Sequence, residues 1–322
     1  MRQPLKHASE EPSPAMFLHT LTALTLAMLI APAAQADVPP ALLDAARDAK
    51  VVLLGERHDH AGHHLMQEET YRALIATGHR PALVMEMFSR DAQPAIDALL
   101  AGLGTAPDQR ALDLALEQMP QISGFTAGGW QDWAAYRPIV AVALEHGLPV
   151  RAADWPRQTR RALALEGWQA LPSGFVQHFA LDEPAEPDVE DGLTRAIVEG
   201  HCGHAPGDAL EGMVRVQRAR DAGIAGAALD ALAAAGVDQA LVIAGAGHVR
   251  RDLGAPLYLK AAAPELPILT VGLAETGESD AAPDLRPARD EEPFDLVWVA
   301  EAQPREDPCK AFADQLRNMK RQ

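Results

Sequence analysis

The chain has 322 residues, 48% of them hydrophobic, which is enough to bury one large core or two smaller ones. Its formal charge at pH 7 is −17, from 45 acidic and 28 basic residues. This balance argues against nucleic acid or an anionic membrane as the main partner, because both bind to cationic surfaces.

The N-terminal segment, residues 1–36, is typical of a secretory signal peptide. An apolar run at 17–30 is followed by the small-x-small sequence AQA, which signal peptidase cleaves. Two glutamates ahead of the run are unusual, which leaves Met1 and Met16 as alternative starts. No cysteine near the cleavage point would accept a lipid. We therefore expect a soluble periplasmic domain spanning 37–322, with an uncleaved membrane anchor as the alternative.

Apolar segments bounded by turn residues predict buried strands, and helical patterns fall between most of them. Strands are expected at 50–54, 82–87, 149–153, 239–244, 266–272 and 295–300, and helices at 62–77 and 130–145. Short apolar strands alternating with helices indicate an α/β fold, with a mainly parallel sheet flanked by helices.

Two stretches depart from this alternation. Residues 155–236, approximately, are predicted to be a helical subdomain inserted into the α/β domain. Within them, 181–191 has six acids and two prolines and is expected to be a solvated loop. The polar, proline-rich stretch after Leu273 is predicted to be a surface loop.

Cys202 and Cys309 are the two cysteines of the chain. In an oxidising compartment they are able to form a disulfide, but two unpaired thiols fit the spacing equally well.

Ionisable residues follow four of the predicted strands. Glu56 and His58 come after the first strand, Glu86 ends the second, Asp154 ends the third and His248 follows the fourth. Each residue alone is more often structural, as a turn histidine or a paired acid. However, carboxyl ends of parallel strands meet at one edge, where open sheets bind ligands. The convergence of four strand ends therefore predicts a site.

The first predicted helix adds candidates to this edge. His64 and Gln67 fall on one helical face, and His63 adjoins it. Adjacent histidines that simply begin an exposed helix are the alternative.

The predicted insertion adds further candidates. Gln217 and Asp221 interrupt an apolar helical stripe, and buried polar groups need partners, either the backbone or a polar site. His201 and His204 form an HxxH pair, which suits either a zinc ion or a larger ligand pocket.

Several motifs together resemble the ChaN-like haem-binding family of bacterial exported proteins, whose superfamily includes Tiki metalloproteases and erythromycin esterases. The matching stretches extend from about residue 50 to 272 and read LLGERHDHAGHHLMQ, LVMEMF, GWQDWAAYRPIV, GHCGH, MVRVQRARD and IAGAGHVRRDLGAPLYL. Sequence patterns of other enzymes, such as GxSxG, the P-loop and HExxH, are absent.

The resemblance implies haem binding in the cleft, a role in haem or iron uptake with other envelope components, and a haem-bound homodimer. Family members are described as lipoproteins, whereas this chain lacks the lipid-accepting cysteine, and Asp154 stands where an asparagine is expected. In the Tiki and esterase branches, the positions matching Glu56, His58, Glu86 and His248 form the catalytic or metal centre.

The resemblance does not identify the axial ligand of the haem iron. Because iron in haem proteins is held by histidine, tyrosine, methionine or cysteine, the candidates are Tyr71, Tyr136, Tyr258, His58 and His248.

Three functions follow from these patterns. We expect a haem-binding protein with an apolar slot that is lined in part by Met85, Met87 and Met213. The alternative is a hydrolase of the superfamily type, either with a divalent metal on the four strand-end residues or with Glu56 orienting His58 as a base. A non-catalytic scaffold is the third hypothesis, because a fold does not determine function.

Overall fold

The computed structural model describes residues 38–104, 107–203, 207–276, 284–307, 309–310 and 313. The predicted signal peptide and the two alternative starts lie outside these residues. In the described part of the chain, no helix is both long and apolar enough to cross a membrane.

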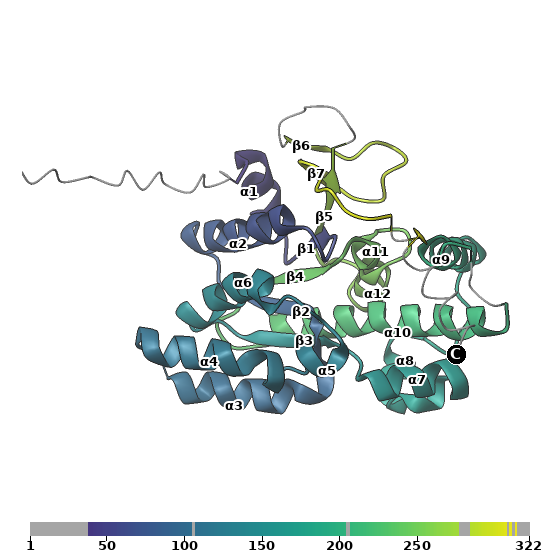
Figure 1. Ribbon diagram of the computed structural model, residues 1–322, viewed down its shortest axis with the longest axis horizontal. Coiled ribbons are helices and arrows are strands. Elements are labelled where there is room, and N and C mark those ends of the chain that lie inside the picture. The colour runs from purple at the N-terminus through teal and green to yellow at the C-terminus, as the bar shows by residue number, and fades with distance from the viewer. Residues whose placement is uncertain are drawn as a thin grey trace, which may run out of the picture. The chain divides into compact units, whose positions relative to one another are not determined.

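A seven-stranded sheet, in the order β3-β2-β4-β1-β5-β7-β6, forms the centre of the compact unit at 36–322. Its strands are β1 (Val51–Glu56), β2 (Pro81–Ser89), β3 (Val150–Asp154), β4 (Gln239–Gly245), β5 (Ile268–Glu275), β6 (Asp284–Pro287) and β7 (Leu296–Ala300). The pairings are parallel except that β6 runs antiparallel to β7 (Figure 1). The predicted α/β fold with a mainly parallel sheet is confirmed.

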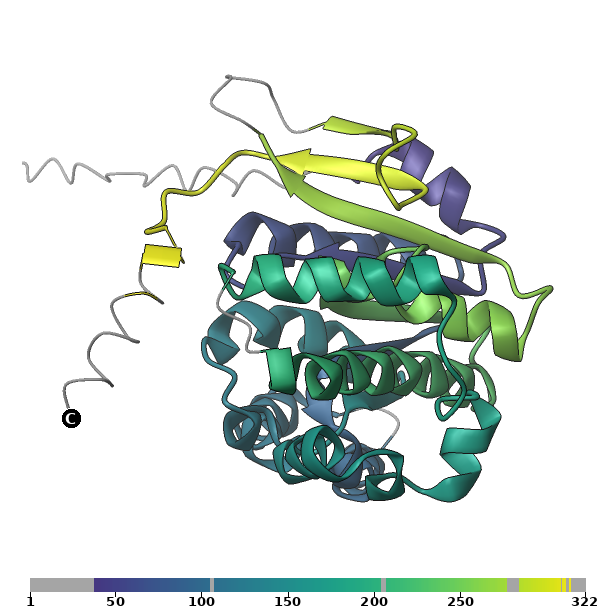
Figure 2. The ribbon, with the colours of Figure 1, turned by 90° about the vertical axis from the view of Figure 1, so that its right-hand side faces the viewer.

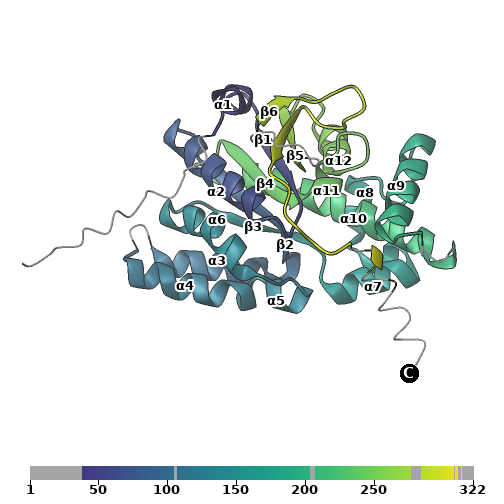
Figure 3. The same cartoon turned by 45° about the horizontal axis from the view of Figure 1, so that its top comes forward.

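Helices cover both faces of the sheet, which is why the inner strands β1 and β4 are buried along their whole length rather than on alternate residues. Val52 and Leu54 of β1 face one core, while Val51 and Leu53 face the other. The first core is covered by α1 (Pro40–Ala46), α2 (Ala61–Ala76), α3 (Gln93–Leu103), α4 (Gln109–Ile122), α5 (Phe125–Gly128) and α6 (Trp133–Glu145). The second is covered by α7 (Arg157–Glu166), α8 (Ser173–His178), α10 (Gly207–Leu232), α11 (Ala246–Val249) and α12 (Ala255–Ala262) (Figure 3).

The segment predicted as a helical insertion leads from β3 to β4. It contains α7, α8, α9 (Pro187–Gly200), α10 and the short 3₁₀ helix Trp168–Ala170. Its longest helix, α10, packs directly on β2, β3 and β4, so this segment also forms one layer of the α/β fold. That position brings the middle of α10 close to the strand ends.

Two loop predictions are wrong in part. The acidic stretch 181–191 is a loop only at its start, because α9 begins at Pro187, with Asp188 and Glu190 in its first turn. Proline suits a first helical position and acids favour the positive end of the helix dipole. Within the polar stretch after Leu273, β6 forms the edge of the sheet, where polar residues and proline are tolerated.

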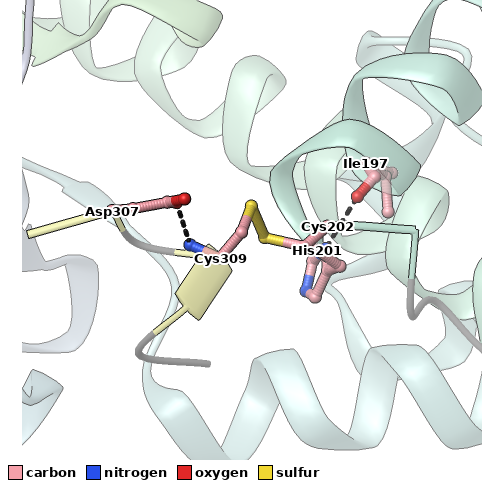
Figure 4. The surroundings of a disulfide bond; sticks show 5 residues. All are labelled: Ile197, His201, Cys202, Asp307 and Cys309. Atoms are coloured by element: carbon pink, nitrogen blue, oxygen red, sulfur yellow. Dashed lines mark hydrogen bonds between the residues drawn. A yellow bond between two sulfur atoms is a disulfide. The ribbon is translucent and has the colours of Figure 1, made fainter. Parts of the chain in front are cut away.

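A disulfide joins Cys202, just after α9, to Cys309 in the C-terminal segment, across 107 residues of sequence (Figure 4). This segment leaves the sheet after β7 (Figure 2). His60 Nε2 lies 3.0 Å from the carbonyl oxygen of Glu301, and Arg305 donates to Asp59 and Glu275. The C-terminal segment is therefore fastened to the turn after β1 as well as to the end of α9.

Candidate functional site

The carboxylate of Glu56, at the end of β1, is buried and surrounded by hydrogen-bond donors. Its Oε1 accepts a hydrogen bond of 2.6 Å from the Tyr136 hydroxyl and lies 2.8 Å from His58 Nδ1. Its Oε2 lies 3.2 Å from His64 Nε2. Burial alone would raise the pKa of Glu56, but its contacts with His58 and His64 lower the pKa to about 2. Glu56 is therefore an ionised acceptor at neutral pH.

Glu86, in β2, is the second buried carboxylate. Its Oε1 accepts a 2.5 Å hydrogen bond from the Arg220 guanidinium, and its Oε2 accepts one of 2.6 Å from the Gly245 backbone NH. Burial would raise the pKa of Glu86, but electrostatic interactions with His248 and Arg220 lower it strongly. His58 Nε2 lies 3.9 Å from Glu86 Oε2, so this carboxylate borders the Glu56 group.

His248 forms an acid–imidazole pair with α10. It follows β4, and its Nδ1 lies 2.6 Å from Asp221 Oδ1 and 3.0 Å from the Gln217 amide nitrogen. Its Nε2 lies 3.5 Å from Glu86 Oε1. Burial raises the pKa of Asp221, although His248 and Arg220 oppose the shift. The polar residues that interrupt the α10 stripe thus face the strand ends.

Asp154, at the end of β3, connects this group to α7. Its Oδ2 accepts a hydrogen bond of 2.7 Å from Arg160, and its Oδ1 accepts one of 3.1 Å from Arg220. Arg220 therefore bridges Asp154 and Glu86, which neutralises part of the negative charge buried at this edge.

His58 is the more accessible of the two strand-end histidines. Its side chain is 37% exposed, whereas that of His248 is 7% exposed. Its ring meets the Trp130 ring edge-on, with centroids 4.8 Å apart. Burial lowers the pKa of His58, but the charges of Glu86 and Glu56 outweigh burial and raise it. A Cβ on Gly245 would come within 2.8 Å of His58 Nε2, so any larger residue there would displace the His58 ring.

An open cavity of about 330 Å³ lies beside these residues. Trp130 and Asp154 belong both to its wall and to the surroundings of the buried group. The other lining residues come from the ends of β2 and β3, the connections around α4 and α5, and the start of α7: Met87, Ser89, Asp91, Ala92, Gln121, Ile122, Gly124, Ala127, Gly128, Trp155, Pro156, Arg157 and Arg160. A hollow with aromatic and charged walls at the carboxyl edge of a parallel sheet is suited to a ligand.

The structure thus brings Glu56, His58, Glu86 and His248 together, each at or just after a strand end. The predicted pocket residues His64, Asp154, Gln217 and Asp221 join them through the contacts described above. Gln67 lies one turn below His64 on α2, fully buried, and neither polar atom of its side-chain amide has a hydrogen-bond partner among the described residues. Internal water commonly satisfies such groups.

Other candidates lie elsewhere. Tyr71 donates to the Pro81 carbonyl at the start of β2, the opposite end from the site. Tyr258 contacts Arg218 on α10, and burial raises its pKa to about 12. His201 Nδ1 donates to the Ile197 carbonyl beside the disulfide (Figure 4).

Neither metal prediction is supported. His201 stands apart from the buried group, and His204 lies outside the described residues. In the part of the chain that the structure describes, no three histidine, cysteine or acidic side chains are arranged to hold a metal ion. Both oxygens of Glu86 accept hydrogen bonds, from Arg220 and the Gly245 NH, and Oε1 of Glu56 accepts one from Tyr136, so these donors compete with a metal ion for three of the four carboxylate oxygens.

Sequence reasoning missed Arg220, Arg160 and Trp130. Arg220 follows Gln217 by three positions on α10, so the helical period would have placed it near the same polar group. Arg160 and Trp130 carry no comparable signal, because their contacts depend on how α7 and the connection before α6 are placed.

Fold and site together define a class: an α/β protein with buried acid and imidazole pairs beside a ligand-sized cavity at the carboxyl edge of its sheet. The family model for haem-binding uptake proteins of the Tiki superfamily, ChaN, matches residues 42–259. The chain belongs to this family.

Solved structures also resemble the chain. ChaN of Campylobacter jejuni, described as binding haem cofacially, has a TM-score of 0.60 and 19% identity, and the match covers 81% of this chain and 91% of that one. The type III effector HopBA1 has a TM-score of 0.43 and 15% identity, covering 81% and 92%. An erythromycin esterase, EreC, has a TM-score of 0.41 and 13% identity, covering 85% and 82%. No curated protein matches the chain in sequence.

Proposed function

We propose that this chain is an exported haem-binding protein that takes part in haem or iron uptake. The observation that carries the proposal is the cavity beside the strand ends, in a chain of the ChaN family. Its volume of about 330 Å³ suits part of a bound ligand, and Met87, Ile122 and Trp130 give it an apolar wall. A porphyrin needs such a wall together with an axial ligand for its iron.

The accessible imidazole of His58 is the axial ligand that fits best. The Tyr136 hydroxyl is buried and donates to Glu56, and His248 is held by Asp221 at 2.6 Å. Since a protonated imidazole cannot bind iron and the pKa of His58 is raised, haem affinity should increase as the pH rises through that pKa.

The test is a haemin titration of the purified protein, followed by the Soret absorbance. We expect a saturable, shifted band that weakens or moves in His58→Ala. His146→Ala is the matched control, because His146 is an exposed histidine at the end of α6. A Soret band that does not respond to the protein would refute haem binding, and one unaffected by His58→Ala would refute this ligand.

Export and assembly are part of the same proposal. The signal-peptide pattern at 1–36 supports delivery to the periplasm, and the family resemblance supports a haem-bound homodimer and envelope uptake partners. Fractionation of expressing cells tests the compartment, and sedimentation with and without haemin tests the dimer. A cytoplasmic product or an unchanged monomer would contradict the respective part.

Acid–base hydrolysis is the second candidate, favoured by one observation. Glu56 holds His58 by Nδ1, which is how a carboxylate orients a general base. Hydrolysis of p-nitrophenyl acetate that is lost in both Glu56→Gln and His58→Ala but retained in His146→Ala would support it.

A further inference from the structure

The cavity has one apolar wall and one basic wall. Trp130, Met87 and Ile122 line the first, while Arg157 and Arg160, from the first turn of α7, line the second. We infer that Arg157, aided by Arg160, binds the carboxylate groups of a flat amphipathic ligand. The inference rests on the proposed function, under which these carboxylates are the two propionates of haem.

Of the two arginines that line the cavity, Arg157 has no partner within the described residues. Its side chain is exposed, and among the described residues its guanidinium forms neither an ion pair nor a hydrogen bond. The neighbouring Arg160 donates to Asp154, whose other oxygen accepts from Arg220. The charge of Arg160 is therefore shared, whereas that of Arg157 is available to an anion.

The acidic residues near the cavity do not pair with Arg157 in place of a ligand carboxylate. Asp154 is held between two guanidiniums. Asp91 also lines the cavity, but its Oδ1 accepts a 2.6 Å hydrogen bond from the Ser89 hydroxyl, and no ion pair with Arg157 occurs in the described structure. In a chain of net charge −17, an unpaired arginine on a cavity wall is a specific feature that an anionic group would explain.

The two walls together determine the chemical class of the ligand. The guanidinium fork of arginine matches the planar geometry of a carboxylate, and the indole and thioether side chains favour a flat apolar body. A ligand with both properties is an aromatic or macrocyclic carboxylic acid, whereas a neutral ester of the same molecule would lose the basic contact.

The experiment compares haemin with its dimethyl ester, both delivered from the same cosolvent, on the unmodified protein and on Arg157→Gln. We expect Arg157→Gln to weaken haemin binding about tenfold, the effect of losing one charge-assisted contact, and to leave ester binding unchanged. Arg161→Gln is the matched control, because Arg161 is exposed on the same helix and does not line the cavity. Thermal unfolding of each variant verifies that the fold is intact.

The outcomes separate the two proposals. Haemin binding that is equally tight for the acid, the ester and Arg157→Gln would overturn the carboxylate inference and leave haem binding standing. An equal loss in Arg157→Gln and Arg161→Gln would also overturn it, because general charge would then explain the effect. Failure of the unmodified protein to bind haemin at all would overturn both proposals.

Discussion

Two buried glutamates, Glu56 and Glu86, dominate the electrostatics of the site. An isolated buried carboxylate is costly, and each is stabilised by a different means. Glu86 has the fixed charge of Arg220 and a backbone NH in addition to the His248 imidazole, while Glu56 has no arginine and depends on a tyrosine hydroxyl and on imidazoles. Since imidazoles titrate near neutral pH and arginine does not, the surroundings of Glu56 respond more to pH.

We predict that Glu56→Gln changes how the free energy of unfolding depends on pH in the acidic range. The folded pKa of about 2 lies below the ordinary 4.5, so ionised Glu56 stabilises the fold above pH 4.5. This stabilisation is lost as the pH falls from about 4.5 to 2, on the order of 3 kcal/mol. Urea unfolding at a series of pH values should show a lower free energy of unfolding for Glu56→Gln at pH 7 and a shallower loss on acidification.

Glu117→Gln is the control for this prediction, because Glu117 is exposed on α4. Its curve should follow that of the unmodified protein. A Glu56→Gln curve parallel to both across this pH range would contradict the assigned role of the Glu56 carboxylate.

At the scale of elements, α10 delivers the side chains that complete the site. It lies so close to β3 that a Cβ on Gly223 would come within 2.6 Å of the Ala153 carbonyl oxygen. In the same region, the Trp155 indole donates to the Ala219 carbonyl, and Arg90 donates to that of Gly223. Close packing here places Arg220 and Asp221, which precede Gly223 by three and two residues and so by less than one helical turn, against the strand ends.

We predict that Gly223→Ala pushes α10 away from β3 and costs about 1–3 kcal/mol of unfolding free energy, the usual penalty for overpacking. Haemin affinity should fall as well, because Arg220 and Asp221 move with the helix. Gly102→Ala near the end of α3 is the control: nothing lies within 4 Å of its added Cβ, so stability should not decrease. Equal stability of both variants in urea would show that the close approach is unimportant.

In the molecule as a whole, the disulfide links the C-terminal segment covalently to the end of α9. Without it, the segment would be held by its noncovalent contacts, such as Arg305 with Glu275 and the Glu301 carbonyl with His60. Because Asp59 and His60 belong to the turn that follows Glu56 and His58, the segment also borders the site.

We predict that the double variant Cys202→Ser, Cys309→Ser loses at most about 4–5 kcal/mol of unfolding free energy, the chain-entropy limit for a ring of roughly this size. Protease cleavage within 301–309 should become faster. Dithiothreitol should reproduce both effects in the unmodified protein and change nothing in the double variant. Unchanged cleavage in the double variant would indicate that the noncovalent contacts alone hold the segment.

Local patterns in the chain specify the α/β class, the positions of the main strands and the edge at which acids and imidazoles gather. These features are local, because an apolar run bounded by turns specifies a buried strand, and parallel strands bring their carboxyl ends to one edge. Glu56, Glu86 and Asp154 could therefore be placed from their positions in the chain alone.

The pairing of those residues depends on how distant elements pack. Tyr136 reaches Glu56 across 80 residues, and Arg220 reaches Glu86 across 134, because α6 and α10 pack on opposite faces of the sheet and bring these side chains to its edge. The disulfide, the edge strand β6 and the cavity beside Arg157 also follow from tertiary packing. Each depends on the direction and depth at which distant elements pack, which local periodicity does not encode.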